Sequence, residues 1–371
     1  MRVGLTLYGS LDGQSGGFRY DRKLVEGLRA AGDTVEVVEL PWRSYPRGLL
    51  DALSPSLRDR LSVDVDVMLQ DELAHPTLVG LNRGLPYPVV SVVHHLRASE
   101  PRRLAPLYRA VERRYLATVD GAVCNSHATR QSVRETGRPA ADRTVVAPPA
   151  GDRFDPDVDD GEIADRAHEG PLRIAFVGNI EPRKGLDTLV DALARLDDPW
   201  KLTAVGRHRD ESYVGAVRRR VAATGTDERV HLPGRLSDAD LADVLRSSHV
   251  LAVPSRYEGF GIVYLEGMSF GLPAVATTAG GAADIVDDGE TGFLVEPDDP
   301  AGLSRALATL AGDRDRLARM GRAARRRYER HPDWAETVDR VRSLLRTVAD
   351  RDDTGDTAAA TVGTEGAPEV R

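Results

Sequence analysis

Short β-rich runs alternate with helical patterns along most of this chain, and the alternation stops once and then restarts. Alternation of this kind predicts a parallel sheet with helices on both faces. The expected strands of the first series are residues 3–8, 34–40, 63–70, 88–94, 121–125 and 144–147. Those of the second series are residues 172–178, 201–206, 230–232, 250–254 and 273–277. We therefore expect an α/β chain of two doubly wound domains in tandem, with a ligand at the carboxyl ends of the strands.

The break between the two series lies at residues 152–170, which are acidic and poor in bulky apolar side chains, as linkers and surface loops are. We place the domain boundary there, with an N-terminal domain at residues 1–160 and a C-terminal domain at residues 161–330. Residues 331–349 are expected to form a helix. One arrangement open to this helix is to pack back on the N-terminal domain. Residues 350–371 hold too little apolar surface to offset the entropy of ordering, so we expect a disordered tail.

The composition narrows the class of protein and its compartment. A net charge of -8 and a pI near 5.7 argue against a nucleic acid as a partner, because proteins that bind nucleic acids normally have a strongly basic face. Cys124 is the only cysteine, which excludes a disulfide framework and favours a reducing compartment. No apolar run approaches the ~20 residues that span a bilayer, and the first residues lead directly into a strand pattern without a signal segment. We expect a cytoplasmic protein, attached at most to the inner face of the cell membrane.

A glycine-rich loop follows the first expected strand. Gly13, Gly16 and Gly17 precede an expected helix that starts at Phe18. Glycines let a ligand approach the backbone closely, and the free amides of a helix N-terminus favour an anion. The loop lacks the GxGxxG spacing, and a plain turn between strand and helix is the alternative.

A second loop, GNIEPRKG, joins the first strand of the C-terminal series to a helix. It contains Arg183 and Lys184, and Lys184 is one of only three lysines in the chain. At the carboxyl end of a strand, an arginine fork and a lysine point charge can clamp a diphosphate. A solvated pair of charges is the alternative interpretation.

The stretch SRYEGFGIVYLEG places two carboxylates, Glu258 and Glu266, on either side of a glycine turn. The turn at residues 259–261 follows an expected strand and precedes an expected helix, so its amides would face the cleft and bind phosphate. Carboxylates fit such a place because they accept hydrogen bonds from sugar hydroxyls, as they do from ribose in dinucleotide sites. An acidic residue favoured by the helix dipole would account for only one of the two.

These motifs match one family. SRYEGFGIVYLEG, the following GLPAVAT, AGG and DGETGFLV, and the loop GNIEPRKGLDTLVDAL together resemble the retaining glycosyltransferases of family 4. The resemblance covers nearly the whole chain apart from the tail. It implies the GT-B fold, in which two Rossmann-like domains face a central cleft. It also implies transfer of a hexose from a nucleotide diphosphate sugar to the hydroxyl of a lipid, a glycan or a small molecule, without a metal or other cofactor.

The resemblance implies roles for individual residues. Glu258 would contact the transferred sugar, and Glu266 would hold the ribose. Arg183 and Lys184 would neutralise the diphosphate, with Glu258 and His94 completing the catalytic set. The remaining donor contacts implied are Gly17, Gly178, Leu236, Gly259, Phe260 and Gly261. Of these, Gly17 would lie near the phosphates or the acceptor, and the backbone at residues 235–236 would hold the base.

Two histidines, His94 and His95, end an expected strand. The resemblance implies that His94 faces the reacting sugar, whereas His95 orients a neighbour; a buried structural imidazole is the alternative for each. We do not expect a metal, since no carboxylate or cysteine stands at ligand spacing in the sequence. The DxD pattern formed by Asp64 and Asp66 is interpreted as a capping or surface pair.

A run of arginines at residues 97–114 alternates with apolar side chains. An amphipathic helix of this type can lie on an anionic membrane and present a lipid acceptor. A solvated face, paired with Glu100 and Glu112, is the alternative. Two other functions also remain open at this stage, a nucleotide-sugar epimerase of the same fold and a catalytically silent scaffold.

Overall fold

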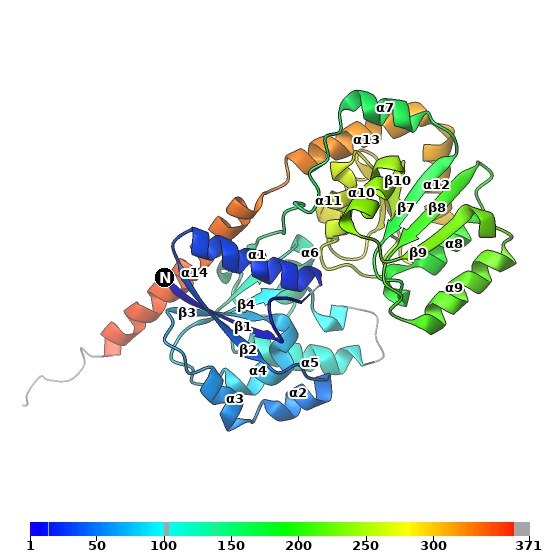
Figure 1. The fold of residues 1–371 in the computed structure, drawn as a ribbon. Coiled ribbons are helices and arrows are strands. Elements are labelled where there is room, and N and C mark those ends of the chain that lie inside the picture. Colours follow the sequence, from blue (N-terminus) through cyan, green and yellow to red (C-terminus); the bar gives the residue numbers. More distant parts are fainter. Residues whose placement is uncertain (14, 100–103, 137, 360–371) are drawn as a thin grey trace, which may run out of the picture.

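The computed structural model describes residues 1–13, 15–99, 104–136 and 138–359, with side chains described up to residue 350. The chain forms two lobes, each built on a parallel sheet of six strands (Figure 1). The first sheet comprises β1 (Arg2–Tyr8), β2 (Thr34–Leu40), β3 (Val67–Asp71), β4 (Val89–Val93), β5 (Gly121–Cys124) and β6 (Thr144–Val146). The second comprises β7 (Leu172–Val177), β8 (Trp200–Val205), β9 (Val230–Gly234), β10 (Val250–Ala252), β11 (Ala274–Thr277) and β12 (Gly292–Val295). Two doubly wound α/β domains in tandem are thereby confirmed.

The strand order of each sheet locates its ligand crevice. The first sheet runs β2-β1-β3-β4-β5-β6, and the second runs β12-β11-β10-β7-β8-β9. The order reverses between β1 and β3 in the first sheet and between β7 and β10 in the second. In open parallel sheets, ligands bind beyond the carboxyl ends of the strands at such reversals. The two reversal points therefore mark where a cleft between the lobes is expected.

Helices cover both faces of each sheet. Those of the first domain are α1 (Gly16–Ala30), α2 (Tyr45–Asp51), α3 (Pro55–Arg60), α4 (His75–Leu81), α5 (Ala105–Leu116) and α6 (His127–Arg134). Those of the second are α7 (Asp160–Ala167), α8 (Leu186–Leu193), α9 (Glu211–Ala223), α10 (Asp238–Ser247), α11 (Ile262–Ser269), α12 (Pro300–Gly312) and α13 (Arg314–Glu329). Alternate residues of β3 face opposite layers: Val67 and Leu69 pack under α1, whereas Met68 packs under α4.

The stretch expected to be a linker contains a helix. Asp159 accepts hydrogen bonds at 2.8 Å from the amides of residues 161 and 162, which caps α7, and Ile163 and Ala167 are buried in the core of the second domain. One of the acidic residues that indicated a linker, Asp159, is thus the cap of a helix. A further difference lies at residues 63–66, expected to begin a strand: β3 starts at Val67. The backbone amide of Arg2 donates to Asp66 there at 2.7 Å, and the Arg2 side chain pairs with both Asp64 and Asp66.

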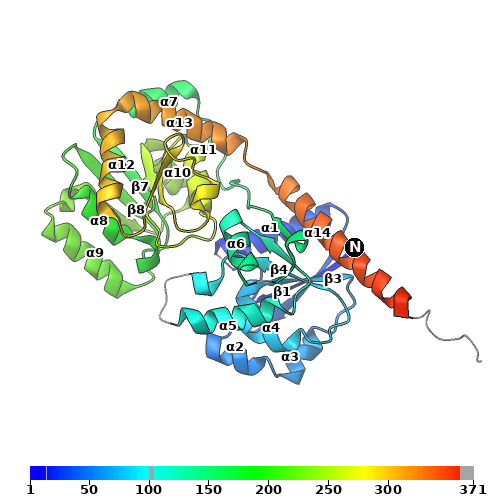
Figure 2. The ribbon, with the colours of Figure 1, turned by 180° about the vertical axis from the view of Figure 1, so that it is seen from behind.

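The last described helix returns to the first domain. After α13, helix α14 (Trp334–Ala359) crosses back and packs along α1 and β6 (Figure 2). Thr337 donates to the carbonyl of Pro148 at 2.6 Å, and Arg342 lies 2.7 Å from the buried carboxylate of Asp33. The tail was expected from residue 350, but α14 continues to Ala359 because extending an existing helix adds one hydrogen bond per residue fixed. Residues 360–371 lie outside the described residues.

Candidate active site

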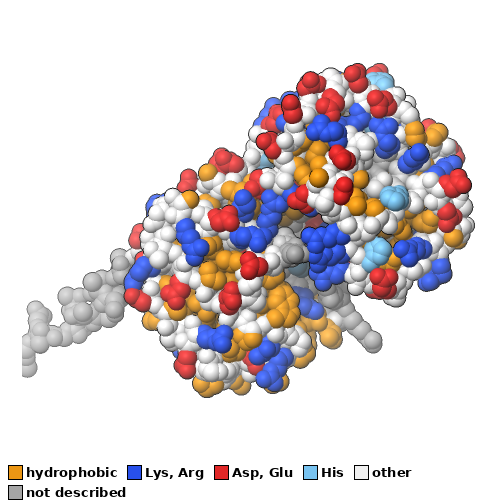
Figure 3. All heavy atoms as spheres, viewed as in Figure 1, with side chains coloured by type: hydrophobic (Ala, Val, Ile, Leu, Met, Phe, Trp, Pro, Cys, Tyr) orange, Lys and Arg blue, Asp and Glu red, His pale blue; other side chains and the backbone are white. Residues whose placement is uncertain are grey.

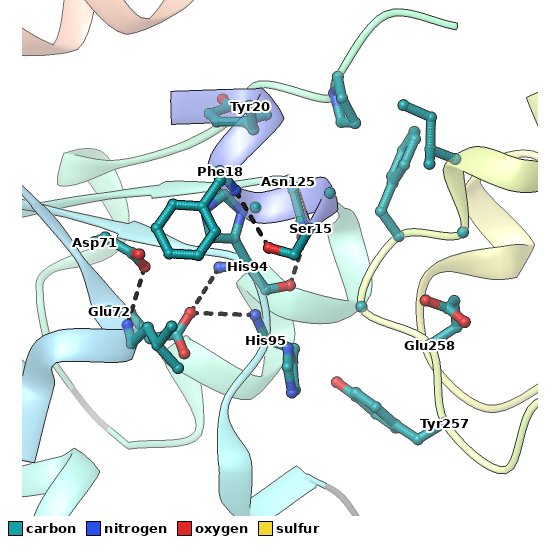
Figure 4. A pocket seen from close by; sticks show the side chains of 18 of the residues that line it. Ser15, Phe18, Tyr20, Asp71, Glu72, His94, His95, Asn125, Tyr257 and Glu258 are labelled. Carbon is teal, nitrogen blue, oxygen red and sulfur yellow. Dashed lines mark hydrogen bonds between the residues drawn. The ribbon is translucent and has the colours of Figure 1, made fainter. Parts of the chain in front are cut away.

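A cavity of 330 Å³ lies between the two lobes, at the carboxyl ends of both sheets. Figure 4 shows Tyr257 and Glu258 of the second domain across from His95 and Glu72 of the first. A neighbouring cavity of 640 Å³ shares Ser15, Phe18 and Leu73 with it. The predicted site residues in the first cavity are Gly17, His94, Arg183, Glu258, Gly259, Phe260 and Gly261. Those in the second are Gly178, Arg235 and Leu236.

The Glu258 carboxylate is the centre of a buried ion-pair cluster. It lies 2.5 Å from Lys184 Nζ and 3.6 Å from the Arg183 guanidinium, and it accepts from the Ser255 hydroxyl at 3.2 Å. Burial alone would raise the pKa of Glu258, but the charges of Lys184 and Arg183 lower it below its ordinary value. Both cations lie in a single turn, Pro182–Lys184, which follows β7 after residues 178–181. The structure therefore brings together the residues predicted to bind sugar and diphosphate.

The turn between Glu258 and α11 requires its glycines. Gly261 has φ of +92°, a left-handed conformation, at the start of α11. A Cβ on Gly259 would lie 2.5 Å from the His94 carbonyl oxygen, across the cleft. The Gly259 carbonyl accepts a hydrogen bond from the Ser126 hydroxyl at 2.8 Å. This turn is thus held against the first domain, near the end of β5.

The His94 imidazole turns toward a buried carboxylate. Its Nε2 lies 3.3 Å from Asp21 of α1, and its ring meets Tyr20 edge to face at 5.3 Å. Burial alone would lower the pKa of His94, but Asp21, with Asp71 and Glu72 nearby, raises it to about 9. A Cβ on Gly17 would lie 3.1 Å from the His94 ring, so the glycine lets α1 approach the histidine.

Carboxylates do accompany this histidine, contrary to the argument from sequence spacing. Asp21 and Asp71 are buried, and one ligand atom from each lies within 4.8 Å of the other and of a His94 ring nitrogen. Among the described residues these three side chains are therefore close enough to share a cation. The sequence could not show this, because Asp21 and His94 stand 73 residues apart on different elements. The backbone amides of His94 and His95 both donate to Glu72, at 2.9 and 3.4 Å.

Glu266 occupies a different place from Glu258. It is 4% exposed and pairs with Arg153 at 3.3 Å, and Arg153 also reaches Asp238 at 2.7 Å. Burial raises the pKa of Glu266, and the charge of Arg153 opposes that rise. Arg153, not Glu266, lines the second cavity. Sequence reasoning missed Arg153 because it stands in the acidic stretch assigned to the linker; its one signal was a basic residue among carboxylates.

The second cavity is rich in arginine. Arg153, Arg207, Arg209 and Arg235 line it beside the backbone of Gly178 and Leu236. Arg207 and Arg209 directly follow β8, and their signal in the sequence was two cations at the end of an expected strand. Basic side chains gather along the boundary between the lobes on this face (Figure 3). Such a cavity suits an anionic ligand that extends from the Glu258 cluster.

Comparison with known proteins gives two family matches. The family Glycosyl transferases group 1 matches residues 161–327, and Glycosyltransferase Family 4 matches residues 15–152. The chain belongs to the family 4 glycosyltransferases. It is 34% identical over 259 residues to D-inositol 3-phosphate glycosyltransferase of Nocardia farcinica, covering 63% of this chain and 56% of that protein. This alignment spans little more than half of the relative's length.

Other similarities extend over nearly the whole of this chain. Phosphatidyl-myo-inositol mannosyltransferase of Mycobacterium leprae is 28% identical over 382 residues, covering 94% of this chain and 97% of that protein. Sucrose-phosphate synthase from Thermosynechococcus elongatus superposes with a TM-score of 0.78 at 22% identity, covering 94% of this chain and 99% of that chain. Anabaena HepE in complex with UDP-glucose gives 0.72 at 19% identity, covering 95% and 100%. At such identities the structures show the fold alone, and they confirm the predicted GT-B architecture.

The basic run of this family 4 glycosyltransferase folds in two parts. Arg97 stacks on the rings of Tyr45 and Tyr108, at 5.2 and 4.8 Å from their centroids. Glu112 is 1% exposed and accepts from the backbone of Ala98 at 3.2 Å, and burial raises its pKa to about 7. Glu112 is therefore not the salt-bridge partner that a solvated face required, and Glu100 lies outside the described residues.

The exposed surface of α5 carries both apolar and basic side chains. Leu104 and Leu107 are each 54% exposed, and Arg109 and Arg113 are exposed on the same helix. Such a surface is able to rest on an anionic lipid headgroup region. No helix among the described residues combines the length and the apolar character that crossing a bilayer would require.

Proposed function

We propose that this chain is a metal-independent, retaining glycosyltransferase that moves a hexose from a nucleotide diphosphate sugar to an acceptor hydroxyl. The observation that carries the proposal is the cluster of Glu258, Lys184 and Arg183 in the cleft between the domains. A diphosphate needs fixed positive charge, and a hexose needs acceptors for its hydroxyls. The cluster supplies both within one hydrogen-bonded unit.

The cations act on the leaving group. As the bond between the sugar and the diphosphate breaks, negative charge grows on the phosphate oxygens, and Lys184 and Arg183 stabilise it. The amides of the turn at Gly259–Gly261 add donors to the same oxygens. Fixed charges of this kind are usually the largest single contribution to a rate enhancement. Because the chain's own side chains provide the charge, the proposed reaction has no step that requires a metal ion.

Glu258 positions the sugar and forms no covalent bond to it. Its carboxylate has the Lys184 ammonium and the Ser255 hydroxyl as neighbours, and sugar hydroxyls would take the remaining acceptor positions. In the front-face mechanism that we propose, the leaving phosphate oxygen removes the proton from the acceptor hydroxyl, and the acceptor oxygen attacks from the same side. The configuration at the anomeric carbon is thereby retained.

The first domain completes the reacting site from the opposite wall. The His94 ring, held by Asp21, presents a positive edge toward the sugar, and Gly17 keeps space for the acceptor or the phosphates. At the other end of the donor, Glu266 would accept from the ribose once Arg153 turns toward the phosphates. The base would lie along the backbone at Arg235 and Leu236 in the second cavity.

The acceptor is proposed to be a phosphorylated or lipid-linked polyol. The names of two relatives, D-inositol 3-phosphate glycosyltransferase and phosphatidyl-myo-inositol mannosyltransferase, support this class. The exposed leucines and arginines of α5 would hold the protein on the inner face of the membrane if the acceptor is a lipid. The UDP-glucose complex of HepE supports a uridine donor as the first to test.

The experiment is a transfer assay with defined donors and acceptors. The full chain is incubated with UDP-, GDP- and ADP-hexoses, with and without inositol phosphate or phosphatidylinositol vesicles, and the products are followed by mass spectrometry and NMR. A product with retained anomeric configuration supports the proposal. Conversion of the donor alone, without acceptor, would identify an epimerase. Nucleotide-sugar binding without any turnover, over a broad acceptor set, would identify a silent scaffold.

A further inference from the structure

A separate cavity of 430 Å³ lies at the junction of the two domains. Its walls come from α6 and β6 of the first domain and from Asp284 and Arg327 of the second. The two connections between the domains contribute Pro148 and His331. Phe260, in the turn at residues 259–261 (the donor turn), lines this cavity as well as the cleft. An occupant would therefore touch both domains and both of the connections between them.

The charge of this cavity is strongly positive. Arg130, Arg327 and Arg340 all line it, together with a single carboxylate, that of Asp284. That carboxylate is already engaged, since it accepts from the backbone amide of His127 and lies 3.2 Å from the His127 ring. Arg327 donates from Nη2 to the Asp284 carbonyl at 2.7 Å, and its Nε lies 3.7 Å from the Asp287 carboxylate, so Nη1 is the nitrogen left to meet an anion. Within the described part of the chain, the guanidinium groups of Arg130 and Arg340 have no ion-pair partner.

One buried nitrogen at the same place lacks a partner. The Nε2 of His331 lies 3.0 Å from the Pro149 carbonyl, which fixes the proton on that nitrogen. The other ring nitrogen, Nδ1, is buried and has no hydrogen-bond partner among the described residues. It is thus an acceptor. A buried polar atom without a partner loses free energy that a bound ligand can restore.

We propose that this cavity binds a phosphate or a phosphomonoester. Phosphate oxygens match the fork of an arginine side chain, and the three arginines around the cavity present such forks to one anion. Arg130 and Arg340 would hold the anion from the side of the first domain, and Arg327 from the second. The bound anion ties the two domains together and supports Phe260, whose ring lies 5.9 Å from that of His331.

The test measures phosphate binding by the full chain at constant ionic strength. Inorganic phosphate and glycerol phosphate are titrated by calorimetry and by thermal unfolding, with sodium chloride as the reference salt. The variants are Arg130→Gln and Arg340→Gln. Arg319→Gln is the matched control, because Arg319 is exposed on α13 and lines neither cavity, and Arg183→Gln reports any phosphate that binds in the cleft. We expect phosphate to raise the Tm of the wild type and of Arg319→Gln equally. Arg130→Gln and Arg340→Gln should each bind phosphate about tenfold more weakly, as expected for the loss of one charge-assisted hydrogen bond.

The comparison between variants decides the outcome. A phosphate shift that survives Arg130→Gln and Arg340→Gln but is lost in Arg183→Gln places the anion in the cleft and overturns the proposal. Absence of any shift in the wild type also overturns it. Arg340 is exposed, so its variant should fold even if Arg130→Gln does not. Tighter binding of glycerol phosphate would assign the site to a phosphomonoester, and equal binding to free phosphate. Glycosyl transfer is not the readout, so these results do not depend on the proposed function.

Discussion

Lys184 Nζ lies 2.5 Å from the carboxylate of Glu258, so the group assigned to the diphosphate and the group assigned to the sugar neutralise each other before either meets a ligand. Both are largely buried, and neither charge would be stable there alone. On the proposed function, donor binding would replace one contact with another: the lysine would turn to phosphate, and the glutamate would turn to sugar hydroxyls. This exchange would explain why the two residues are present together.

Removing the lysine should reduce turnover while the protein stays folded. Lys184→Ala takes away one charge from the leaving group and leaves Glu258 with Arg183 as its remaining cation. We expect transfer to fall about 10²- to 10³-fold, the usual effect of losing one donor to a developing negative charge. Initial rates at saturating donor measure this. Lys201→Ala is the matched control, because Lys201 is exposed on β8 away from both cavities, and equal losses in the two variants would contradict the assignment.

Asp21 should control the protonation of His94. The Asp21→Asn variant removes the charge that most favours the imidazolium, so the pKa of His94 should fall from about 9 by at least one unit. Because the pKa is raised in the folded state, its contribution to stability is complete below about pH 6.5 and is lost as the pH rises through about 9. NMR titration of the His94 ring protons measures the pKa directly. An unchanged titration in Asp21→Asn would show that the pair is not coupled.

A side chain at residue 259 should separate the donor turn from the first domain. The Cβ of Gly259→Ala would lie 2.5 Å from the His94 carbonyl oxygen, a backbone atom that has little freedom to move. We expect a loss of about 1–3 kcal/mol in the free energy of unfolding, as for other overpacked sites, and weaker donor binding. Chemical denaturation and calorimetry measure the two effects. In the control variant Gly312→Ala, the new methyl group meets no atom within 4 Å, and its stability should be nearly unchanged.

The contact between α14 and the first domain should depend on pH. Asp33 pairs with Arg342 at 2.7 Å and with the N-terminal amine at 2.9 Å. Burial alone would raise the pKa of Asp33, but these two cations lower it. Its stabilising contribution is therefore present above the ordinary pKa of an aspartate and is lost as the pH falls through the lowered value. Asp33→Asn should lower the Tm at pH 7 and have a much smaller effect in acid; an equal loss at both pH values would disprove the ion pair's role.

The sequence predicted the fold well because both sheets are parallel and buried. Strands such as residues 34–40 are continuous apolar or alternating runs, and short helices separate them. The spacing of apolar residues alone therefore reveals the succession of strands and helices along the chain. It predicted less well where a local feature opposed the composition. The capped helix α7 lies in an acidic stretch, and β3 begins only at Val67, because Asp64 and Asp66 at the expected start of the strand pair with Arg2.

From the first domain the sequence identified Gly17 and His94 as cleft residues, but not the side chains that hold them. Glu258, Lys184 and the glycine turn stand in contiguous motifs of the second domain, so their residue types and spacing carry the information. The partners contributed by the first domain do not. Asp21 reaches His94 from a different helix, and Ser126 reaches Gly259 across 133 residues. Contacts of this kind depend on how two domains pack, and no local pattern records them.

The central claim is that the Glu258 cluster binds a nucleotide diphosphate sugar. The most direct measurement is a thermal-unfolding panel of UDP, GDP, ADP and their hexose conjugates, run on the wild type, Glu258→Gln and Lys184→Ala. We predict that one nucleotide series raises the Tm of the wild type, that its sugar conjugate raises it further, and that Glu258→Gln loses the additional rise. Lys184→Ala should lose most of the shift with the nucleotide diphosphate itself. Equal shifts in all three proteins, or no shift with any of the nucleotides, would contradict the account.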